Sequence, residues 1–213
     1  MLKKGFSGTL VLLGGFMLVF VMMGCGTITF TTGTPSTPSV TVTPARSDPA
    51  RGPGGGIVFY ESAEGFDVGG VICHFLEAAP ADIEGLFFWG GAGFDLRMIE
   101  GATKTGIGGG KSNTNLVVAA NPNNTAARAC ADYRGGGLND WYLPSKDELD
   151  LLNVNQGKIG NFKNDNKNAY SEVRYWSSTQ RNNNGVWAQN FATGSQETQF
   201  LRGTLNVRPI RAY

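Results

Sequence analysis

Apolar and polar residues are arranged along the chain in three different ways, and each arrangement predicts a different kind of segment. Residues 6–23 are almost wholly apolar, interrupted only by Ser, Thr and Gly. Residues 27–53 are rich in Thr, Ser and Pro and contain few apolar side chains. From Gly54 onward, short apolar runs alternate with stretches rich in Gly and Asn, which is typical of a folded domain with many turns.

Short apolar runs near both ends of this domain predict β-strands. They cover residues 57–60, 71–76, 86–89, 175–179, 186–191 and 207–211. In residues 186–191, apolar side chains alternate with polar or small ones, as in a half-buried antiparallel strand. We expect Trp176 and Trp187 to pack between strands. One of Arg208 and Arg211 is expected to pair with a carboxylate inside the domain.

Capping signals predict two helices in the middle of the domain. Thr125 can cap a helix that the glycines at 135–137 end. Ser145, with Glu148 three residues later, forms a capping box for a second helix that ends near residue 157. Residues 115–120 predict a further short helix. The fold class is therefore α+β, with two central helices, antiparallel strands at both ends and a disordered tether before them.

The first 25 residues have the layout of a bacterial export signal. Lys3 and Lys4 precede the apolar run, and Gly24 precedes Cys25. In lipoprotein signals a small residue stands before a Cys that is acylated before cleavage, so we predict a signal peptide over 1–24 and a lipid anchor at Cys25. Because no Asp follows Cys25, the outer membrane or cell surface is the expected location. The alternative is an uncleaved signal anchor with an incidental Cys.

The segment between the anchor and the folded domain predicts an extended linker. Its Thr, Ser and Pro residues cannot bury enough apolar surface to offset the entropy of ordering. A stretch of this length spans at most about 80 Å as polyproline helix. The chain is thus divided into a signal peptide at 1–24, a lipidated Cys and linker at 25–53, and a folded domain at 54–213.

Charge excludes one class of partner. The chain has 18 basic and 17 acidic residues, and removing residues 1–24 removes Lys3 and Lys4 and no acid. The mature chain then has 16 basic against 17 acidic residues, a formal charge of −1. Nucleic-acid binding requires a basic footprint that this composition lacks.

Two cysteines remain once Cys25 carries lipid. In an exported protein, Cys73 and Cys130 could form a disulfide that closes a loop of about 57 residues and stabilises by roughly 4 kcal/mol. They could equally be two separate buried thiols. The sequence leaves both possibilities open.

Candidate catalytic chemistry is weak throughout the sequence. Residues 105–112 resemble a phosphate-binding loop, but Thr105 stands where that motif requires Gly. His74 is the only histidine, and Cys73 beside it would point to the opposite face of a strand. We therefore predict no catalytic residue, no metal and no cofactor. A hydrolase would require convergent acids or a nucleophile–base pair that the sequence does not present.

Several short motifs together resemble the Lcl C-terminal domain family of bacterial surface proteins, from about Gly54 to Tyr213. The motifs are Gly55–Tyr60, Asp140–Ser145 with Glu148–Leu149, Tyr175–Thr179, Trp187 with Phe191, and Val207–Arg208 with Arg211. The resemblance implies a non-catalytic, C-type-lectin-like domain, and the adhesin that names the family binds sulfated glycosaminoglycans. This chain lacks a collagen-like repeat and is nearly neutral, which weakens the case for a highly sulfated ligand.

The Asn-rich segment 180–185 is the best candidate for ligand contact. Asn and Gly favour a hairpin turn, but Asn, Gln and Arg side chains also supply adaptable hydrogen bonds to a ligand. The candidate residues are Arg181, Asn182, Asn183, Asn184, Gln189 and Arg202. We therefore expect a surface lipoprotein whose domain binds an extracellular glycan or protein. The alternative is a structural envelope lipoprotein without a dedicated ligand.

Overall fold

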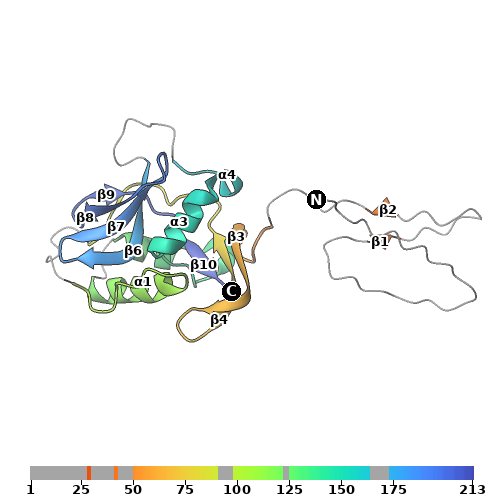
Figure 1. Cartoon of the computed structure of the whole chain (residues 1–213), viewed down its shortest axis with the longest axis horizontal. Coiled ribbons are helices and arrows are strands. Elements are labelled where there is room, and N and C mark those ends of the chain that lie inside the picture. Colours follow the sequence, from red (N-terminus) through yellow and green to blue (C-terminus); the bar gives the residue numbers. More distant parts are fainter. Residues whose placement is uncertain (1–27, 30–40, 43–49, 91–97, 122–124, 164–172) are drawn as a thin grey trace, which may run out of the picture. The chain divides into compact units, whose positions relative to one another are not determined.

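A computed structural model describes residues 28–29, 41–42, 50–90, 98–121, 125–163 and 173–213 (Figure 1). The chain divides into two units, Met1–Ser47 and Asp48–Tyr213. In the first unit, strand β1 (Ile28–Thr29) pairs antiparallel with β2 (Thr41–Val42), inside the segment predicted as a linker. The predicted signal peptide and Cys25 lie outside the described residues. Within the described ranges, no helix is both long and apolar enough to cross a membrane.

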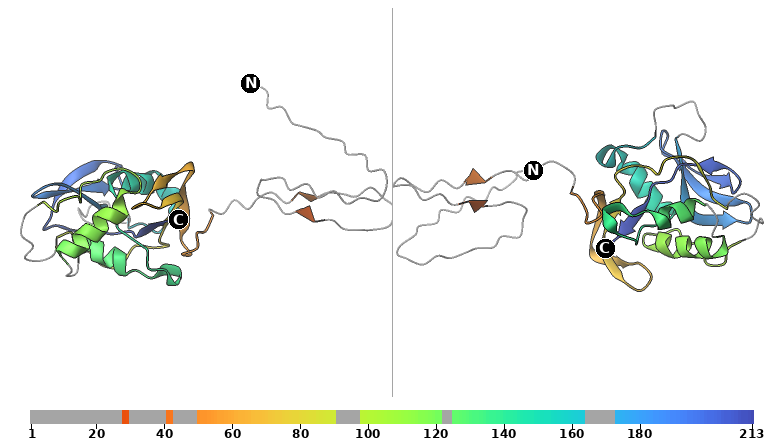
Figure 2. Two further views of the ribbon diagram at one scale, coloured as in Figure 1. Left: turned by 90° about the horizontal axis from the view of Figure 1, so that it is seen from below. Right: turned by 180° about the vertical axis from the view of Figure 1, so that it is seen from behind.

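The second unit combines three small antiparallel sheets with helices from the middle of the chain (Figures 1 and 2). One sheet has the order β10-β4-β3, another pairs β5 with β9, and a third has the order β6-β7-β8. The strands are β3 (Ile57–Asp67), β4 (Ile72–Ala78), β5 (Phe87–Phe88), β6 (Arg174–Asn182), β7 (Gly185–Asn190), β8 (Gln196–Phe200), β9 (Thr204–Leu205) and β10 (Ile210–Ala212). The helices are α1 (Gly109–Ala120), α2 (Ala126–Asp132), α3 (Lys146–Val154) and α4 (Gln156–Ile159), with a 3-10 turn at Gly135–Gly137. This arrangement confirms the predicted mixed fold with central helices.

The apolar residues form two core clusters, and β6 contributes to both. Trp176 belongs to a cluster with α1 and α2 residues, whereas its neighbour Tyr175 belongs to a cluster with α3 residues. Adjacent residues on a strand point to opposite faces, so both faces of β6 are covered here. Leu143 and Tyr142 divide between the same two clusters. Trp176 is fully buried, as expected of a packing residue.

Both predicted helix caps are present. The Thr125 hydroxyl accepts a hydrogen bond from the Arg128 N–H at 3.1 Å and begins α2. The Ser145 hydroxyl accepts from the Glu148 N–H, and the Glu148 carboxylate accepts from the Ser145 N–H at 2.7 Å, which completes the capping box of α3. Helix α3 ends at Val154, and the short α4 extends the helical region to Ile159.

Helix α1 starts six residues earlier than the predicted 115–120 helix, inside a glycine-rich stretch. The reason is close packing against the start of α3. A Cβ atom at Gly110 would lie 2.3 Å from Oε2 of Glu148 and 2.7 Å from the Ser145 nitrogen. Glycine is therefore required here for contact between helices, although in the sequence it reads as a loop signal.

Buried ion pairs tie the last strand and its approach to the body of the domain. Arg208 is buried and donates from Nε to Asp82 at 2.6 Å. Arg211 donates from Nη1 to Glu77 at 3.1 Å and from Nη2 to Asp140 at 2.8 Å. Both arginines thus pair with internal carboxylates, where we had expected one of them to do so. The regular strand is confined to residues 210–212, shorter than the predicted 207–211 run.

The possible disulfide between Cys73 and Cys130 is not formed, and the two cysteines lie in different environments. Cys130 lies on the buried face of α2, within a core cluster. Cys73 lies on β4 opposite Phe66 and belongs to neither cluster of the described domain. Both are buried free thiols, and burial raises the pKa of Cys73 and raises that of Cys130 further. The alternative of two separate thiols is the one the structure adopts.

Candidate ligand-binding site

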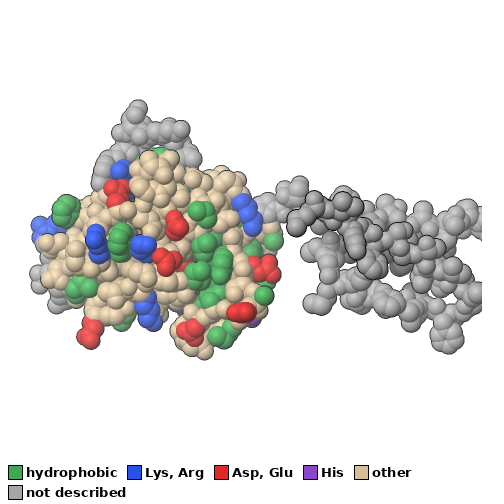
Figure 3. All heavy atoms as spheres, in the orientation of Figure 1, with side chains coloured by type: hydrophobic (Ala, Val, Ile, Leu, Met, Phe, Trp, Pro, Cys, Tyr) green, Lys and Arg blue, Asp and Glu red, His purple; other side chains and the backbone are tan. Residues whose placement is uncertain are grey.

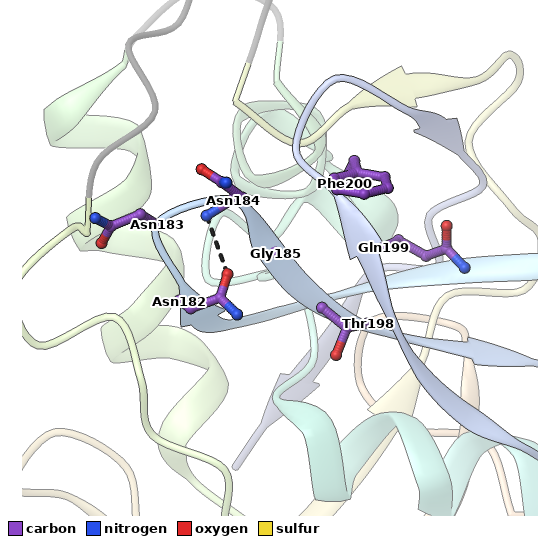
Figure 4. A pocket seen from close by; sticks show the side chains of 7 residues that line it. All are labelled: Asn182, Asn183, Asn184, Gly185, Thr198, Gln199 and Phe200. Carbon is purple, nitrogen blue, oxygen red and sulfur yellow. Dashed lines mark hydrogen bonds between the residues drawn. The ribbon is translucent and has the colours of Figure 1, made fainter.

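The Asn-rich segment forms the turn between β6 and β7. The Asn182 side-chain oxygen accepts a hydrogen bond from the Asn184 N–H at 3.0 Å, which closes the turn locally (Figure 4). All three asparagines of the turn are exposed. A Cβ atom at Gly185 would lie 2.3 Å from the Thr198 methyl carbon, so glycine lets β7 approach β8 closely here. The hairpin interpretation of this segment is therefore confirmed.

A hollow of about 670 Å³ lies between this turn and β8. Its lining consists of Asn182, Asn183, Asn184, Gly185, Thr198, Gln199 and Phe200. The asparagine side chains come from the turn, whereas Thr198, Gln199 and Phe200 come from the neighbouring strand (Figure 4). The ring of Phe200 is 76% exposed, the largest exposed fraction among the large apolar side chains of the described residues.

A second hollow, of about 320 Å³, lies beside the first. It is lined by Asn184, Phe200, Leu201 and Arg202, and most of its surface is apolar. Asn184 and Phe200 line both hollows. The predicted residues Asn182–Asn184 and Arg202 are therefore brought together around one exposed aromatic ring that the sequence analysis did not select.

The Trp187 ring on β7 contacts two cationic side chains, Arg181 of β6 and Lys146 at the start of α3. The Arg181 guanidinium lies 4.8 Å from the centre of the Trp187 ring, and the Lys146 Nζ lies 5.1 Å from it. Arg181 also donates from Nη1 to the Thr198 hydroxyl at 2.5 Å. Trp187 lies opposite Thr198 and is half-buried, so its packing role is shared with the support of these cations. Lys and Arg side chains gather over the part of the face in Figure 3 where β6, β7 and β8 lie.

Gln189 does not belong to this surface. It is fully buried, and its amide donates to Asp150 at 2.7 Å and to the Gly194 carbonyl at 3.1 Å. Its carbonyl oxygen accepts from Gln196 at 3.1 Å. These bonds fasten β7 to α3, so the role of Gln189 is to hold the strand in place. Asp150, which is itself exposed, thus accepts a hydrogen bond from a buried side chain.

The other chemical candidates have structural partners. Gly108, in the loop-like segment before α1, donates its N–H to the Glu148 carboxylate at 2.8 Å. The exposed His74 ring places Nδ1 2.9 Å from the Ser62 carbonyl, and Cys73 beside it is buried. Across the described ranges, no group of three His, Cys, Asp or Glu side chains could hold a metal ion.

Comparisons with known proteins identify a family and include a distant structural neighbour. The model of the Lcl C-terminal domain family matches residues 102–211. A solved fimbrial protein from Bacteroides ovatus is similar at 15% sequence identity with a TM-score of 0.46, over 83% of this chain and 47% of that one. This chain thus spans about half the length of the fimbrial protein. No curated protein matches the chain by sequence.

Proposed function

The chain belongs to the Lcl C-terminal domain family, and from this membership we propose that it is a cell-surface protein whose folded domain binds an extracellular ligand without catalysis. In this proposal the domain is C-type-lectin-like. A lipid on Cys25 attaches it to the membrane, and residues 27–53 hold it away from the surface. The family match and the export-like N-terminal sequence support this location.

The observation that carries the proposal is the pair of hollows around Phe200. The larger has a volume in the range of known small-ligand sites. Exposed amides beside an exposed aromatic ring combine adaptable hydrogen bonding with a rigid apolar contact, which is a common composition for binding surfaces. A single exposed Phe needs no binding role to explain it, but this one lines two neighbouring hollows.

The lining of the larger hollow supports binding over catalysis. Its side chains are amides, hydroxyls and an aromatic ring, and none of them is an acid or a base. General acid–base chemistry requires a titratable group within hydrogen-bond reach of the reacting atoms. The same neutral lining suits a hydroxyl-rich or peptide ligand.

The test is a binding screen on residues 48–213, a unit that contains both core clusters and can be expected to fold alone. A glycan array including sulfated glycosaminoglycans, and a panel of extracellular-matrix proteins, would be probed with calcium and with chelator. We expect saturable binding that Asn183→Ala weakens by about fivefold or more. Asn139→Ala, another exposed asparagine far along the chain from the turn, is the matched control and should bind normally.

Two results would contradict the proposal. One is a well-folded sample that binds none of these ligands. The other is binding that survives the combined replacement Asn183→Ala with Phe200→Ala, because such binding would have to use another surface.

A further inference from the structure

Hydrogen bonds at the two ends of the β7–β8 pair establish which backbone groups of β8 point outward. The Asn190 N–H donates to the Ser195 carbonyl, and the Leu201 N–H donates to the Asn184 carbonyl. In antiparallel pairs, mutually bonded residues recur at every second position. Residues 197 and 199 therefore bond to β7, and Gln196, Thr198 and Phe200 turn their N–H and carbonyl groups away from it.

This outer side of β8 is an open sheet edge. Strand β8 is the last in the order β6-β7-β8, and no other described strand pairs with it. On this side of β8, the only main-chain hydrogen bond among the described residues runs from the Gly203 N–H to the Phe200 carbonyl. An unpaired edge of this kind is a template for another extended segment.

The exposed ring of Phe200 lies where a side chain of such a segment would fall. Side chains on an added strand alternate between the two faces, and successive ones on one face are about 7 Å apart. A side chain opposite Phe200 on the added strand would lie beside this ring, as cross-strand neighbours do. The two hollows lie on the other side of β8, because Asn184 of the β6–β7 turn lines both of them.

The charges beside this edge are positive. Arg181, held at Thr198, and Arg202, at the end of the strand, are both exposed, and neither forms an ion pair with any described residue. The one acid of the strand, Glu197, is already paired with Arg174 at 2.6 Å. Acidic side chains on the incoming segment would therefore be attracted. A second copy of this chain is disfavoured, because antiparallel pairing centred on Thr198 would bring two Arg181 side chains together.

We propose that the open edge of β8 pairs with an extended, acidic peptide segment of the ligand, one of whose apolar side chains packs on the exposed ring of Phe200. This inference rests on the proposed function, since it assigns a partner to the same surface. Main-chain pairing supplies the affinity, and Phe200 and the two arginines select the sequence.

The test uses residues 48–213 and a library of blocked synthetic heptapeptides. Leu, Val or Phe alternates with Thr in these peptides, and Asp, Lys or neutral residues occupy the ends. Fluorescence anisotropy should show the Asp-flanked peptides binding in preference to the Lys-flanked ones. Thr198→Pro removes an outward N–H that the domain itself does not use, and should weaken binding about tenfold or more. Thr103→Val, at an exposed threonine outside this surface, should bind within about twofold of the wild type.

Backbone N-methylation of alternate peptide residues provides an independent check, because it removes the N–H donors that the peptide would use to pair with β8. The inference is overturned if N-methylated peptides bind equally well, if Thr198→Pro binds normally, or if no peptide binds. In the last case, glycan binding that still depends on Asn183 would leave the proposed function standing. A concentration-dependent dimer that Thr198→Pro converts to a monomer would mean that a second copy occupies the edge. Circular dichroism and a melting curve verify that each variant is folded.

Discussion

Arginine has opposite roles in two regions of this domain. Near the C-terminus, Arg208 and Arg211 are buried and pair with Asp82, Glu77 and Asp140. On the β6–β8 sheet, Arg181 is exposed and supported by an aromatic ring and a hydroxyl. A buried arginine with acid partners mainly fixes the position of a strand, whereas an exposed arginine held in one orientation can meet a ligand. Stability and binding should therefore respond to changes in different regions.

The largest effect on stability is expected from Arg208→Met. The side chain also donates to the Ala79 carbonyl and lies 4.0 Å over the Phe162 ring. Its removal leaves Asp82 as a buried charge without this partner, and we expect a loss of about 3–5 kcal/mol in the free energy of unfolding. Urea denaturation measures this loss. A matched change of an exposed arginine, Arg181→Met, should cost under about 0.5 kcal/mol, and equal losses in the two variants would refute the comparison.

A smaller effect is expected from Glu148→Gln. Burial raises the pKa of Glu148, against hydrogen bonds from the Ser145 and Gly108 N–H groups that lower it. The amide cannot accept at both positions, so we expect a loss of about 1–3 kcal/mol.

The pH dependence gives the sign of the Glu148 contribution. A raised folded-state pKa means that the stabilisation of the protonated form is complete below the unfolded pKa and is lost as the pH rises through the folded one. The wild type should therefore lose stability relative to Glu148→Gln as the pH rises from the acid range toward neutrality. A stability difference that grows with pH would be the opposite of this expectation.

The cysteines should give an intermediate to small effect. Because both are free thiols, dithiothreitol should change the melting temperature of the purified domain by less than about 1 °C. Cys130→Ser places a hydroxyl in an apolar core and should cost about 1–3 kcal/mol. Thermal melts of the wild type with and without reductant, and of the variant, measure these effects. A marked drop in melting temperature with reductant would show that the two cysteines form a disulfide.

The smallest stability effect is expected at the turn. Asn183→Ala and Phe200→Ala remove exposed side chains and should alter the free energy of unfolding by less than about 0.5 kcal/mol. The same variants should lose ligand affinity. Chemical denaturation and binding titrations on the same samples separate the two properties, and a large loss of stability would give these residues a structural role instead.

The elements that local signals specify were predictable, and those that depend on distant partners were not. The capping box at Ser145 and the cap at Thr125 each depend on residues within four positions of one another, so both helix starts were predicted correctly. Strand β8 was missed because its sequence, Gln-Glu-Thr-Gln-Phe, has neither a core face nor a strong strand propensity and forms through pairing with β7. Gln189 was placed on the surface because nothing in the local sequence indicates that its side chain would be buried and bonded to Asp150.

The candidate site shows the same division. The turn asparagines were found because turn chemistry is local. Phe200 was overlooked because apolar residues are ordinarily assigned to the core. Its exposure depends on how β8 ends beside the turn, which the local sequence does not indicate.

The sheet β10-β4-β3 constrains the order in which this protein can mature. Arg211 bonds to Glu77, 134 residues earlier in the chain, and the Tyr213 carbonyl accepts from the His74 and Phe75 N–H groups. At ordinary rates of elongation, residues 57–78 must wait roughly 7–27 s for these partners to be synthesised. During that interval the β3–β4 hairpin lacks its neighbouring strand β10, and Glu77 lacks its partner Arg211. The sheet β10-β4-β3 can therefore be completed only after residues 210–213 have been synthesised.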